Sequence, residues 1–293
     1  MDFRQLERFL AVVDHGGFHR AAEVLYVAQP SLSQSIKQLE RELGDALFRR
    51  VGRGVVLTEA GRALVEPART AVHALGLAVQ SVEAVQGLRT GRLEITAMPS
   101  QAIDPLAGAI SRFTARYPGV RVVVRAAATA EQVMEAVRTG RTELGLLADV
   151  GLPRWPGVGL HPVARQRFVV VASAEGPLPA GERVRAADLS GVRVIAGQPG
   201  TGMRAVVDDL IHSGVELTIA VEIEHREAIL PLVLAGSGIA VLADSWRELA
   251  ERSGAVVVDL DPPVHLDVAY VSHLAGIGPA ARAFLDLASD QER

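Results

Sequence analysis

The chain of 293 residues contains no cysteine. This absence excludes a disulfide framework, a thiolate metal site and a cysteine redox switch. The sequence also has no apolar stretch long enough to span a bilayer. The residues after Met1 lack the basic flank and the short apolar run of a secretory signal. We therefore expect a cytoplasmic protein that has no contact with a membrane.

The motifs of the common hydrolases and metalloenzymes are missing as well. The sequence has no HExxH and no GxSxG, and its eight histidines include no two at metal-ligand spacing on one helix. We therefore expect no enzyme, no metal site and no cofactor. The alternative that stays open is a solute-binding or enzymatic α/β domain with an accessory DNA-binding head. A periplasmic carrier would need the secretory signal that is missing here.

Neither acidic nor basic side chains are in large excess. The net charge is −4, and 49% of the residues are hydrophobic and 22% charged, which is typical of a soluble globular protein. The length predicts two or three domains. The first 60 residues carry eight basic and eight acidic side chains. Nucleic acid would therefore be bound by a small basic surface and by two copies of it, not by the bulk charge.

The first 60 residues have the pattern of three helices. Apolar residues recur at helical spacing in residues 4–14 and 21–25, and Gly16-Gly17 separates the two segments. Pro30 fits the first turn of a third helix, where its missing N–H is no loss, and Gly44 fits the C-terminal end. The buried face of the third helix is predicted to consist of Leu32, Ile36, Leu39 and Leu43.

The other face of the third helix is rich in hydroxyl and amide groups. It carries Ser31, Ser33, Gln34, Lys37 and Gln38. Two helices joined by a tight turn, with polar side chains on the second, form the helix-turn-helix pattern. Serine and glutamine can hydrogen-bond base edges in the major groove and also phosphate oxygens. The alternative is an ordinary three-helix bundle with a polar outer surface.

A basic hairpin is predicted directly after the third helix. Residues 48–51 and 55–57 can pair across the turn Gly52-Arg53-Gly54, and Arg49, Arg50 and Arg53 gather on this hairpin. A basic hairpin in this place is typical of a wing, which reaches phosphates or the minor groove. The hairpin therefore favours a DNA-binding domain over a plain bundle.

The segment AAEVLYVAQPSLSQSIKQLERELGDALFRRVGRGVVLTEAG resembles the winged-helix domain of the LysR-type transcriptional regulators. The resemblance implies that the residues facing the DNA groove are Gln29, Pro30, Ser31, Ser33 and Gln34, and it makes Arg53 the wing contact. Lys37, Arg49 and Arg50 are further DNA-binding candidates from the helix face and the hairpin. The missing cysteine separates the chain from the peroxide-sensing branch of the family.

The chain departs from the family pattern at three positions in this region. Gly17 and Ala28 stand where serine is usual, and Gln34 stands where arginine is frequent. Because position 34 is on the groove-facing side, the last departure concerns the base preference.

A long helix is predicted in residues 59–90, with Thr58 as its N-cap. Apolar residues repeat along it at spacings of four and three: Leu64, Ala68, Ala71, Leu75, Ala78, Val82 and Val85. We interpret this seam as the contact with a second copy of the chain. A dimer would present two recognition helices to an interrupted inverted repeat in double-stranded DNA. The alternative is an amphipathic helix that lies on its own domain.

The remaining residues alternate between strands and helices, which predicts βαβ units and a mostly parallel sheet. The segments GRLEITA, FTARYPGVRVVV, VRTGRTELGLLAD and LVLAGSGIAVLA resemble the co-inducer-binding part of the same family. That part has two α/β lobes, like a periplasmic solute-binding protein. The chain departs from the pattern at Ala243, where proline is usual. The resemblance further implies a tetramer of two dimers and a contact with RNA polymerase.

The expected fold class is therefore α/β, with an N-terminal winged helix-turn-helix, a linker helix and a two-lobed effector domain. We expect a DNA-binding domain in residues 1–58, the linker helix in 59–90 and the effector domain in 91–293. The chain would cross between the lobes after Ala164 and return near Leu266, so lobe I would comprise 91–163 and 267–293, and lobe II 164–266.

A small ligand is expected between the lobes, because ligands of open α/β sheets lie beyond the carboxyl ends of strands, near helix N-termini. The candidate effector-binding residues in such places are Ser100, Gln101, Thr129, Pro199, Gly200, Thr201, Arg204 and His225. By resemblance, Ser100, Thr129 and residues 199–201 match family positions that touch the effector. The alternative is that each hydroxyl only caps a helix.

The charges near this cleft indicate the kind of ligand. Arg204 and His225, with Arg226, would make the cleft cationic, which suggests a small anionic co-inducer. The alternative for Arg204 is an ion pair with Asp208 on the surface of one helix.

Overall fold

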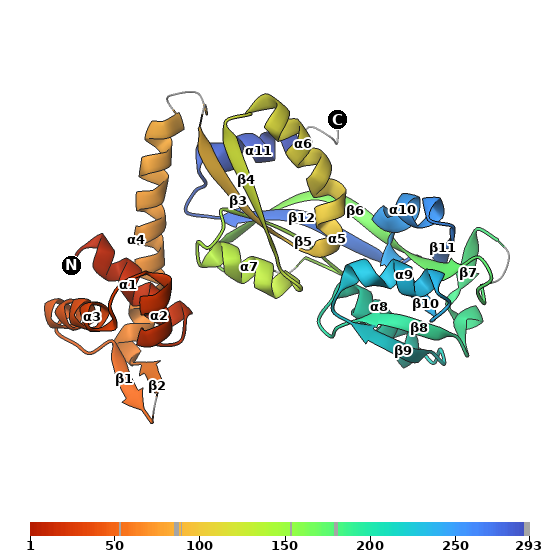
Figure 1. The fold of residues 1–293 in the computed structure, drawn as a ribbon, viewed down its shortest axis with the longest axis horizontal. Helices are drawn as coiled ribbons and strands as arrows, with labels where there is room; N and C mark the ends of the chain where they lie inside the picture. Colours follow the sequence, from red (N-terminus) through yellow and green to blue (C-terminus); the bar gives the residue numbers. More distant parts are fainter. Residues whose placement is uncertain (53, 85–87, 89, 153, 179–180, 290–293) are drawn as a thin grey trace. The chain divides into compact units, whose positions relative to one another are not determined.

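The computed structural model describes residues 1–52, 54–84, 88, 90–152, 154–178 and 181–289. Its contacts divide the chain into two compact units, Met1–Val85 and Gln86–Arg293. Figure 1 shows helices and one hairpin in the first unit, and sheets covered by helices in the second. Each unit has its own hydrophobic core.

The N-terminal unit contains four helices and a two-stranded hairpin. These elements are α1 (Phe3–Asp14), α2 (Phe18–Val24), α3 (Gln29–Leu43), β1 (Phe48–Val51), β2 (Gly54–Leu57) and α4 (Glu59–Ala84). Gly16, at φ +67°, follows the end of α1, and Gly44, at φ +77°, ends α3 in the left-handed conformation. Pro30 lies in the first turn of α3. The predicted three helices and hairpin are thus present.

The core of this unit lies under the apolar face of α3. Its largest fully buried side chains are Phe9, Leu32, Ile36, Leu39 and Leu47. Leu43 is 41% exposed, so its predicted place in the buried face is wrong. It lies in the last turn of α3, next to the Gly44 cap and beyond the part of the helix that covers the core.

Two polar side chains hold the hairpin and α4 to this core. Oε1 of Glu40 accepts a hydrogen bond from the backbone N–H of Leu47 at 2.8 Å. Thr58 caps α4, because its Oγ1 accepts from the N–H of Gly61 at 3.0 Å. The same hydroxyl donates to the carbonyl of Ala46 at 2.6 Å. The hairpin is thus tied to α3, and the start of α4 to the loop before the hairpin.

The first half of the predicted seam on α4 packs on the chain's own domain. Ala68 is 1% exposed, and Leu64 and Ala71 are partly buried against the same core. Ala68 is therefore unavailable for a contact between chains, because α4 covers the open side of the helical bundle, and the contact predicted for Leu64 and Ala71 stays a prediction. Leu75, at 38% exposure, and Ala78 stay accessible. Val85 and the side chain of Val82, also in the predicted seam, lie outside the described residues.

The C-terminal unit has two α/β lobes, each with its own sheet. Lobe I contains β3 (Gly91–Ala97), α5 (Pro99–Gln101), η1 (Ala102–Leu106), α6 (Ala107–Arg116), β4 (Val120–Ala126), α7 (Ala130–Arg138), β5 (Leu144–Asp149), the first part of β6 (Val158–Ser173), β12 (His265–His273) and α11 (Pro279–Ser289). Its sheet has the order β4-β3-β5-β12-β6. Aromatic side chains of α6, β12 and α11 fill its core: Phe113, Tyr270 and Phe284.

Lobe II is built around the second part of β6. It contains β7 (Arg183–Arg185), η2 (Ala186–Leu189), β8 (Arg193–Gly197), α8 (Gly202–His212), β9 (Thr218–Ile223), η3 (Arg226–Ala228), α9 (Ile229–Leu234), β10 (Ile239–Ala243), η4 (Asp244–Trp246), α10 (Arg247–Arg252) and β11 (Ala255–Asp261). The order β6-β10-β8-β9 continues on the other side of β6 with β11 and β7. The α/β fold class predicted from the sequence is therefore confirmed.

Both sheets are mixed, whereas the sequence pattern predicts a mostly parallel sheet. Strands β3, β4 and β5 are parallel, but β12 and β6 pair antiparallel. Strand β6 begins at Val158 and ends at Ser173. It pairs with β12 as far as Arg167 and with β10 from Phe168. The exchange between sheets thus lies slightly later than the predicted crossover after Ala164.

The side chains of His161 and Ser272 join β6 to β12. Nε2 of His161 lies 2.9 Å from Oγ of Ser272, and burial lowers the pKa of His161 below its ordinary value. Protonation therefore favours the unfolded chain. The stabilising contribution is fully present above the unfolded-state pKa of about 6.5 and is lost as the pH falls below it.

We expect the melting temperature of the native chain to fall between roughly pH 7 and pH 5 more steeply than that of the His161→Gln variant. Glutamine retains a polar group near Ser272 but does not titrate in this range. Differential scanning calorimetry at several pH values measures the two slopes. Equal slopes would show that His161 does not contribute to the pH dependence.

Candidate functional site

The exposed face of α3 carries the predicted reading residues. Gln29, Pro30, Ser31, Gln34 and Lys37 are exposed, and Ser33 is partly buried. They lie opposite the buried Leu32, Ile36 and Leu39 because a helix repeats every 3.6 residues. Within residues 1–52 and 54–84, no side-chain hydrogen bond uses the polar groups of this set. Their donors and acceptors are therefore free for an external polar partner.

Gln38 differs from its neighbours on α3. Its Nε2 donates to Oε1 of Glu42 at 2.8 Å, and Glu42 also pairs with the N-terminal ammonium group. These hydrogen bonds lower the pKa of Glu42 to about 2, the bond from the N-terminus most strongly. The side-chain amide of Gln38 thus already forms a hydrogen bond inside the domain.

A basic hollow lies beside the reading face. It is lined by residues of α2, α3 and the hairpin, including Arg20, Lys37, Arg49 and Arg50. Its acidic lining residue, Glu40, already accepts the N–H of Leu47. Arg49 and Arg50 are exposed on β1, as predicted. Arg53, the predicted wing contact, lies outside the described residues.

Arg20 was not among the sequence-predicted site residues. It lies in the first turn of α2, next to Gly17 and Phe18, which also line the hollow. Only the fold brings α2 beside the hairpin, so the local pattern did not distinguish Arg20 from other surface arginines. Its charge adds to a surface suited to phosphate groups.

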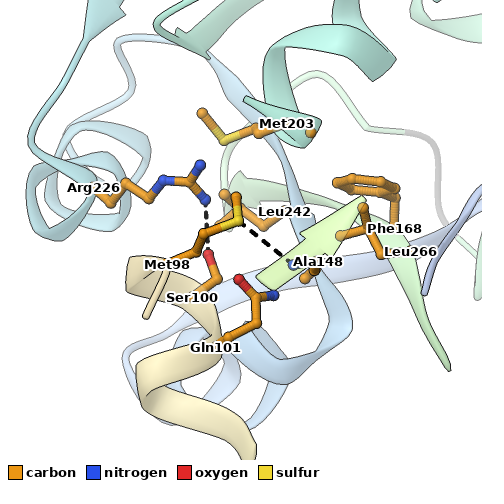
Figure 2. Close-up of a pocket in the computed structure, with 11 residues that line it drawn as sticks. Met98, Ser100, Gln101, Ala148, Phe168, Met203, Arg226, Leu242 and Leu266 are labelled. Carbon is orange, nitrogen blue, oxygen red and sulfur yellow. Dashed lines mark hydrogen bonds between the residues drawn. The ribbon is translucent and has the colours of Figure 1, made fainter. Parts of the chain in front are cut away.

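In the C-terminal unit, a small cavity of about 20 Å³ lies between the lobes. Lobe I contributes Ser100 and Gln101 of α5, which are 5% and 1% exposed. Lobe II contributes Arg226 of η3, and Figure 2 shows its side chain extending towards Ser100. The remaining lining is mostly apolar: Met98, Ala148, Phe168, Met203, Leu242, Ala243 and Leu266, with Gly202 at the start of α8.

The Ser100 hydroxyl is the polar centre of this cavity. Its Oγ accepts hydrogen bonds from Nη1 of Arg226 at 2.8 Å and from Nε1 of Trp246 at 3.4 Å. Both donors come from lobe II, so this hydroxyl joins the two lobes. Burial lowers the pKa of Arg226 below its ordinary value. Of the predicted effector residues, Ser100 and Gln101 line the cavity.

The predicted threonines cap the helices α7 and α8. Oγ1 of Thr129 accepts from the N–H of Gln132 at 3.3 Å, and Oγ1 of Thr201 accepts from the N–H of Arg204 at 3.3 Å. Neither threonine lines the cavity. Both hydroxyls therefore cap a helix, which is the alternative role predicted for them. Their contact with an effector stays a prediction.

The loop that includes Pro199 and Gly200 approaches Thr129 of the other lobe. Pro199 and Gly200 are exposed, and Gly200 has the left-handed φ of +83°. A Cβ built on Gly200 would lie 3.5 Å from Cγ2 of Thr129 in the other lobe. This loop and Thr129 thus face one another across the lobes, outside the cavity itself.

The charge in the cavity comes from Arg226 and not from Arg204 or His225. Arg204 pairs with Asp208, at 2.8 Å, and with Glu222, which neutralises it as the alternative prediction proposed. His225 is 80% exposed and lies 3.5 Å from Glu227. Arg204 and His225 do not line the cavity. Sequence spacing placed all three near the cleft but did not show which side chain points inwards.

The described part of the chain contains no group of three or more His, Cys, Asp or Glu residues that could hold a metal ion. His161 and Ser272 form the pair that most resembles a base with a nucleophile. Ser272 is only 6% exposed, so this hydroxyl lies inside the sheet and not in an open cleft. None of the helices described is long and apolar enough to cross a membrane.

Comparison with known proteins identifies the family. Residues 3–62 match the family described as bacterial regulatory helix-turn-helix protein, lysR family, and residues 86–293 match the LysR substrate binding domain. The HTH-type transcriptional regulator CbbR of Rhodospirillum rubrum is 32% identical over 293 residues, which cover 98% of this chain and 96% of CbbR.

Solved structures agree in fold. A full-length OxyR variant from Pseudomonas aeruginosa has a TM-score of 0.75 and 23% identity, covering 99% of this chain and 94% of its own. Full-length CbnR in complex with its target DNA has a TM-score of 0.62 and 23% identity, covering 99% of both chains. The chain belongs to the LysR family of bacterial transcriptional regulators, with a helix-turn-helix DNA-binding domain followed by a substrate-binding domain.

Proposed function

We propose that α3 reads base edges in the major groove of an operator and that the hairpin and the basic hollow hold its phosphates. The observation that carries this proposal is a set of accessible side chains on α3 that make no hydrogen bond to any residue that the structure describes: Gln29, Ser31, Ser33, Gln34 and Lys37. Glutamine and serine match the donors and acceptors of base edges, and the neighbouring arginines match phosphates. The fold shared with CbnR, which was solved with its target DNA, supports the same assignment.

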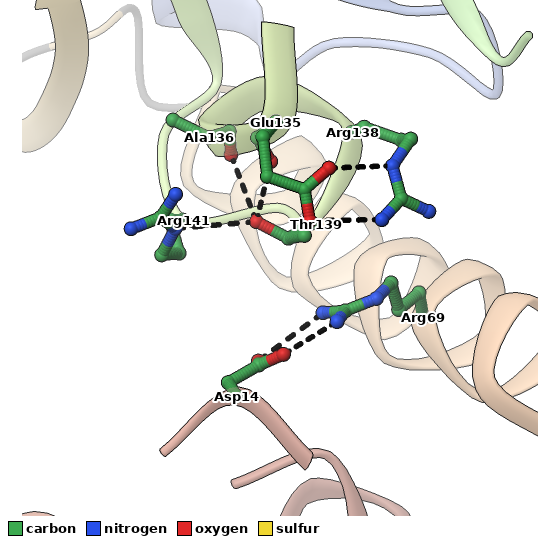
Figure 3. A network of polar contacts seen from close by, with 7 residues as sticks. All are labelled: Asp14, Arg69, Glu135, Ala136, Arg138, Thr139 and Arg141. Carbon is green, nitrogen blue, oxygen red and sulfur yellow. Dashed lines mark hydrogen bonds and ion pairs between the residues drawn. The ribbon is translucent and has the colours of Figure 1, made fainter. Parts of the chain in front are cut away.

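The predicted domain bounds, 1–58, 59–90 and 91–293, are part of this proposal. Two chains would pair through the exposed half of α4, which includes Leu75 and Ala78. Figure 3 shows how α4 is fixed to its own reading head: Arg69 of α4 donates to both carboxylate oxygens of Asp14 in α1, at 3.2 and 2.5 Å. The spacing of two heads would then follow from the pairing of two α4 helices.

The regulator would bind an interrupted inverted repeat as a dimer or as a tetramer of two dimers, and would contact RNA polymerase. A small molecule bound between the lobes would change the relative placement of the reading heads. Such a ligand must bind the two arrangements with different affinity, because otherwise it shifts no population. The cavity at Ser100 is the place that supports this part of the proposal.

A footprint of the purified protein on the DNA upstream of its own gene, at several salt concentrations, tests the proposal. A protected, interrupted inverted repeat is expected. Salt-sensitive binding without any preferred sequence on this DNA or on a random-sequence pool would contradict a sequence-specific regulator.

The Gln29→Ala and Arg50→Ala variants separate the two roles. Gln29→Ala is expected to weaken operator binding by about 1–3 kcal/mol and non-specific binding little. Arg50→Ala is expected to weaken both and to lower the salt slope by about one. Arg252→Ala is the matched control, because Arg252 is 71% exposed on α10 in the other unit. Operator discrimination unchanged in Gln29→Ala would show that this residue does not read bases.

A further inference from the structure

We propose that Arg226 selects the effector and that the effector is a small monoanionic carboxylate with an apolar body. This inference rests on the proposed function of the inter-lobe cavity as the effector site. It goes further by naming one recognition residue and one chemical class of ligand.

Arg226 carries an unbalanced charge. Its Nη1 donates to the neutral hydroxyl of Ser100, and its buried Nη2 has no hydrogen-bond partner among the described residues. No carboxylate in the described part of the chain forms an ion pair with it. Arg204, by contrast, pairs with two carboxylates in the same lobe. A buried guanidinium without a counter-ion is costly, and a bound anion would remove that cost.

Further hydrogen-bond donors lie around that charge. The free Nη2 of Arg226 and the Ser100 hydroxyl hydrogen can both be donated to one external acceptor. Gly202, whose N–H belongs to the first turn of α8, lines the same cavity. Charge-assisted bonds from a guanidinium to a carboxylate are among the strongest in proteins. A single carboxylate therefore satisfies the donors that the cavity offers.

The rest of the wall is apolar apart from Gln101. Met98, Phe168, Met203, Leu242 and Leu266 offer no donors for hydroxyl or phosphate oxygens. The Nε2 of Gln101 already donates to Gln166 at 3.4 Å, and its buried Oε1 is an acceptor that no described residue uses. A phosphorylated sugar would bury polar groups there without partners, which disfavours its binding. The ligand should therefore carry one charged end and a hydrocarbon body.

The cavity is smaller than any such ligand. About 20 Å³ is room for a single water molecule. A larger ligand must displace side chains, and the unbranched Met98 and Met203 are the ones best able to move. It must also lie between Arg226 and Ser100, which now join the lobes. Binding would thus replace the direct hydrogen bond between the lobes by contacts of each lobe with the ligand. The ligand would in this way change the relative placement of the two lobes.

Isothermal titration of the full-length protein tests this inference with a fixed panel of probes. The panel contains hexanoate and benzoate, their neutral counterparts hexanamide and benzamide, and 3-phosphoglycerate as a polar, multiply charged anion. We expect at least one of the two carboxylates to bind, and its amide and 3-phosphoglycerate to bind at least tenfold more weakly. Arg226→Gln should weaken carboxylate binding by roughly 30-fold or more. The charge-matched control Arg252→Gln should not, because Arg252 is exposed on α10.

A second variant tests whether the probes bind in the cavity. Met203→Trp fills the cavity and should abolish binding of every probe, while circular dichroism checks that the variant is folded. A probe whose binding is lost in Met203→Trp but kept in Arg226→Gln would overturn the inference and leave the cavity as a ligand site. Stronger binding of an amide or of 3-phosphoglycerate would also overturn it. Failure of the whole panel to bind would overturn both the inference and the assignment of the cavity.

Discussion

Replacing Gly61 with alanine is expected to lower the free energy of unfolding of the N-terminal unit by about 2–3 kcal/mol. Gly61 lies in the first turn of α4, where a Cβ would be 2.1 Å from the carbonyl oxygen of Leu47 and 2.9 Å from Cδ2 of Leu57. The oxygen belongs to the backbone, which cannot move away like the end of a flexible side chain. The start of α4 would have to shift, and with it the Thr58 cap.

Gly76 in the same helix provides the matched control. Apart from the backbone of α4 itself and the two chain neighbours, no described atom lies within 4 Å of a Cβ built on Gly76, so Gly76→Ala should raise stability by about 0.5–1 kcal/mol through helix propensity. Urea unfolding followed by circular dichroism gives both values, and hydrogen exchange in residues 3–84 assigns them to the N-terminal unit. A loss of stability in both variants, or in neither, would contradict the steric explanation.

Replacing Phe284 with alanine is expected to destabilise lobe I by about 3–5 kcal/mol. Phe284 is fully buried, and its ring centroid lies 5.4 Å from that of Phe113 and 5.6 Å from that of Tyr270. These rings come from α6, β12 and α11, so the last helix of the chain closes a core that begins far earlier in the sequence. Removing the ring leaves a cavity that three elements share.

Calorimetry of the Phe284→Ala variant should show a lower melting temperature for the C-terminal unit. Leu274→Ala is the control, because this leucine is 68% exposed and its loss should change stability by less than about 0.5 kcal/mol. A small effect of Phe284→Ala would mean that α11 is dispensable for the core of lobe I. In that event, removal of residues 279–293 should leave the unit folded.

The sequence predicted the elements that local rules determine. Pro30 and Gly44 mark the ends of α3, and the spacing of Leu32, Ile36 and Leu39 determines which face it buries. The reading face then follows from the same helical repeat. The local sequence pattern was therefore enough to identify the DNA-binding candidates on α3, and the structure places them on one surface.

Other features depend on contacts between distant parts of the chain. A heptad repeat does not say which surface it meets, and the structure places Leu64 and Ala68 against their own domain. Likewise, Arg204 meets Glu222 on a neighbouring strand, whereas Arg226 meets Ser100 in the other lobe. Ion pairing across elements therefore decided which arginine enters the cavity, and no local spacing carries that information.

Strand β6 has a mechanical consequence for the effector domain. One continuous strand, Val158–Ser173, is hydrogen-bonded into the sheet of lobe I as far as Arg167 and into that of lobe II from Phe168. Because both sheets are hydrogen-bonded to the same strand, any change in the angle between the lobes must twist or bend this strand near Arg167 and Phe168. We therefore expect rotation of one lobe against the other to be small and to reverse when its cause is removed.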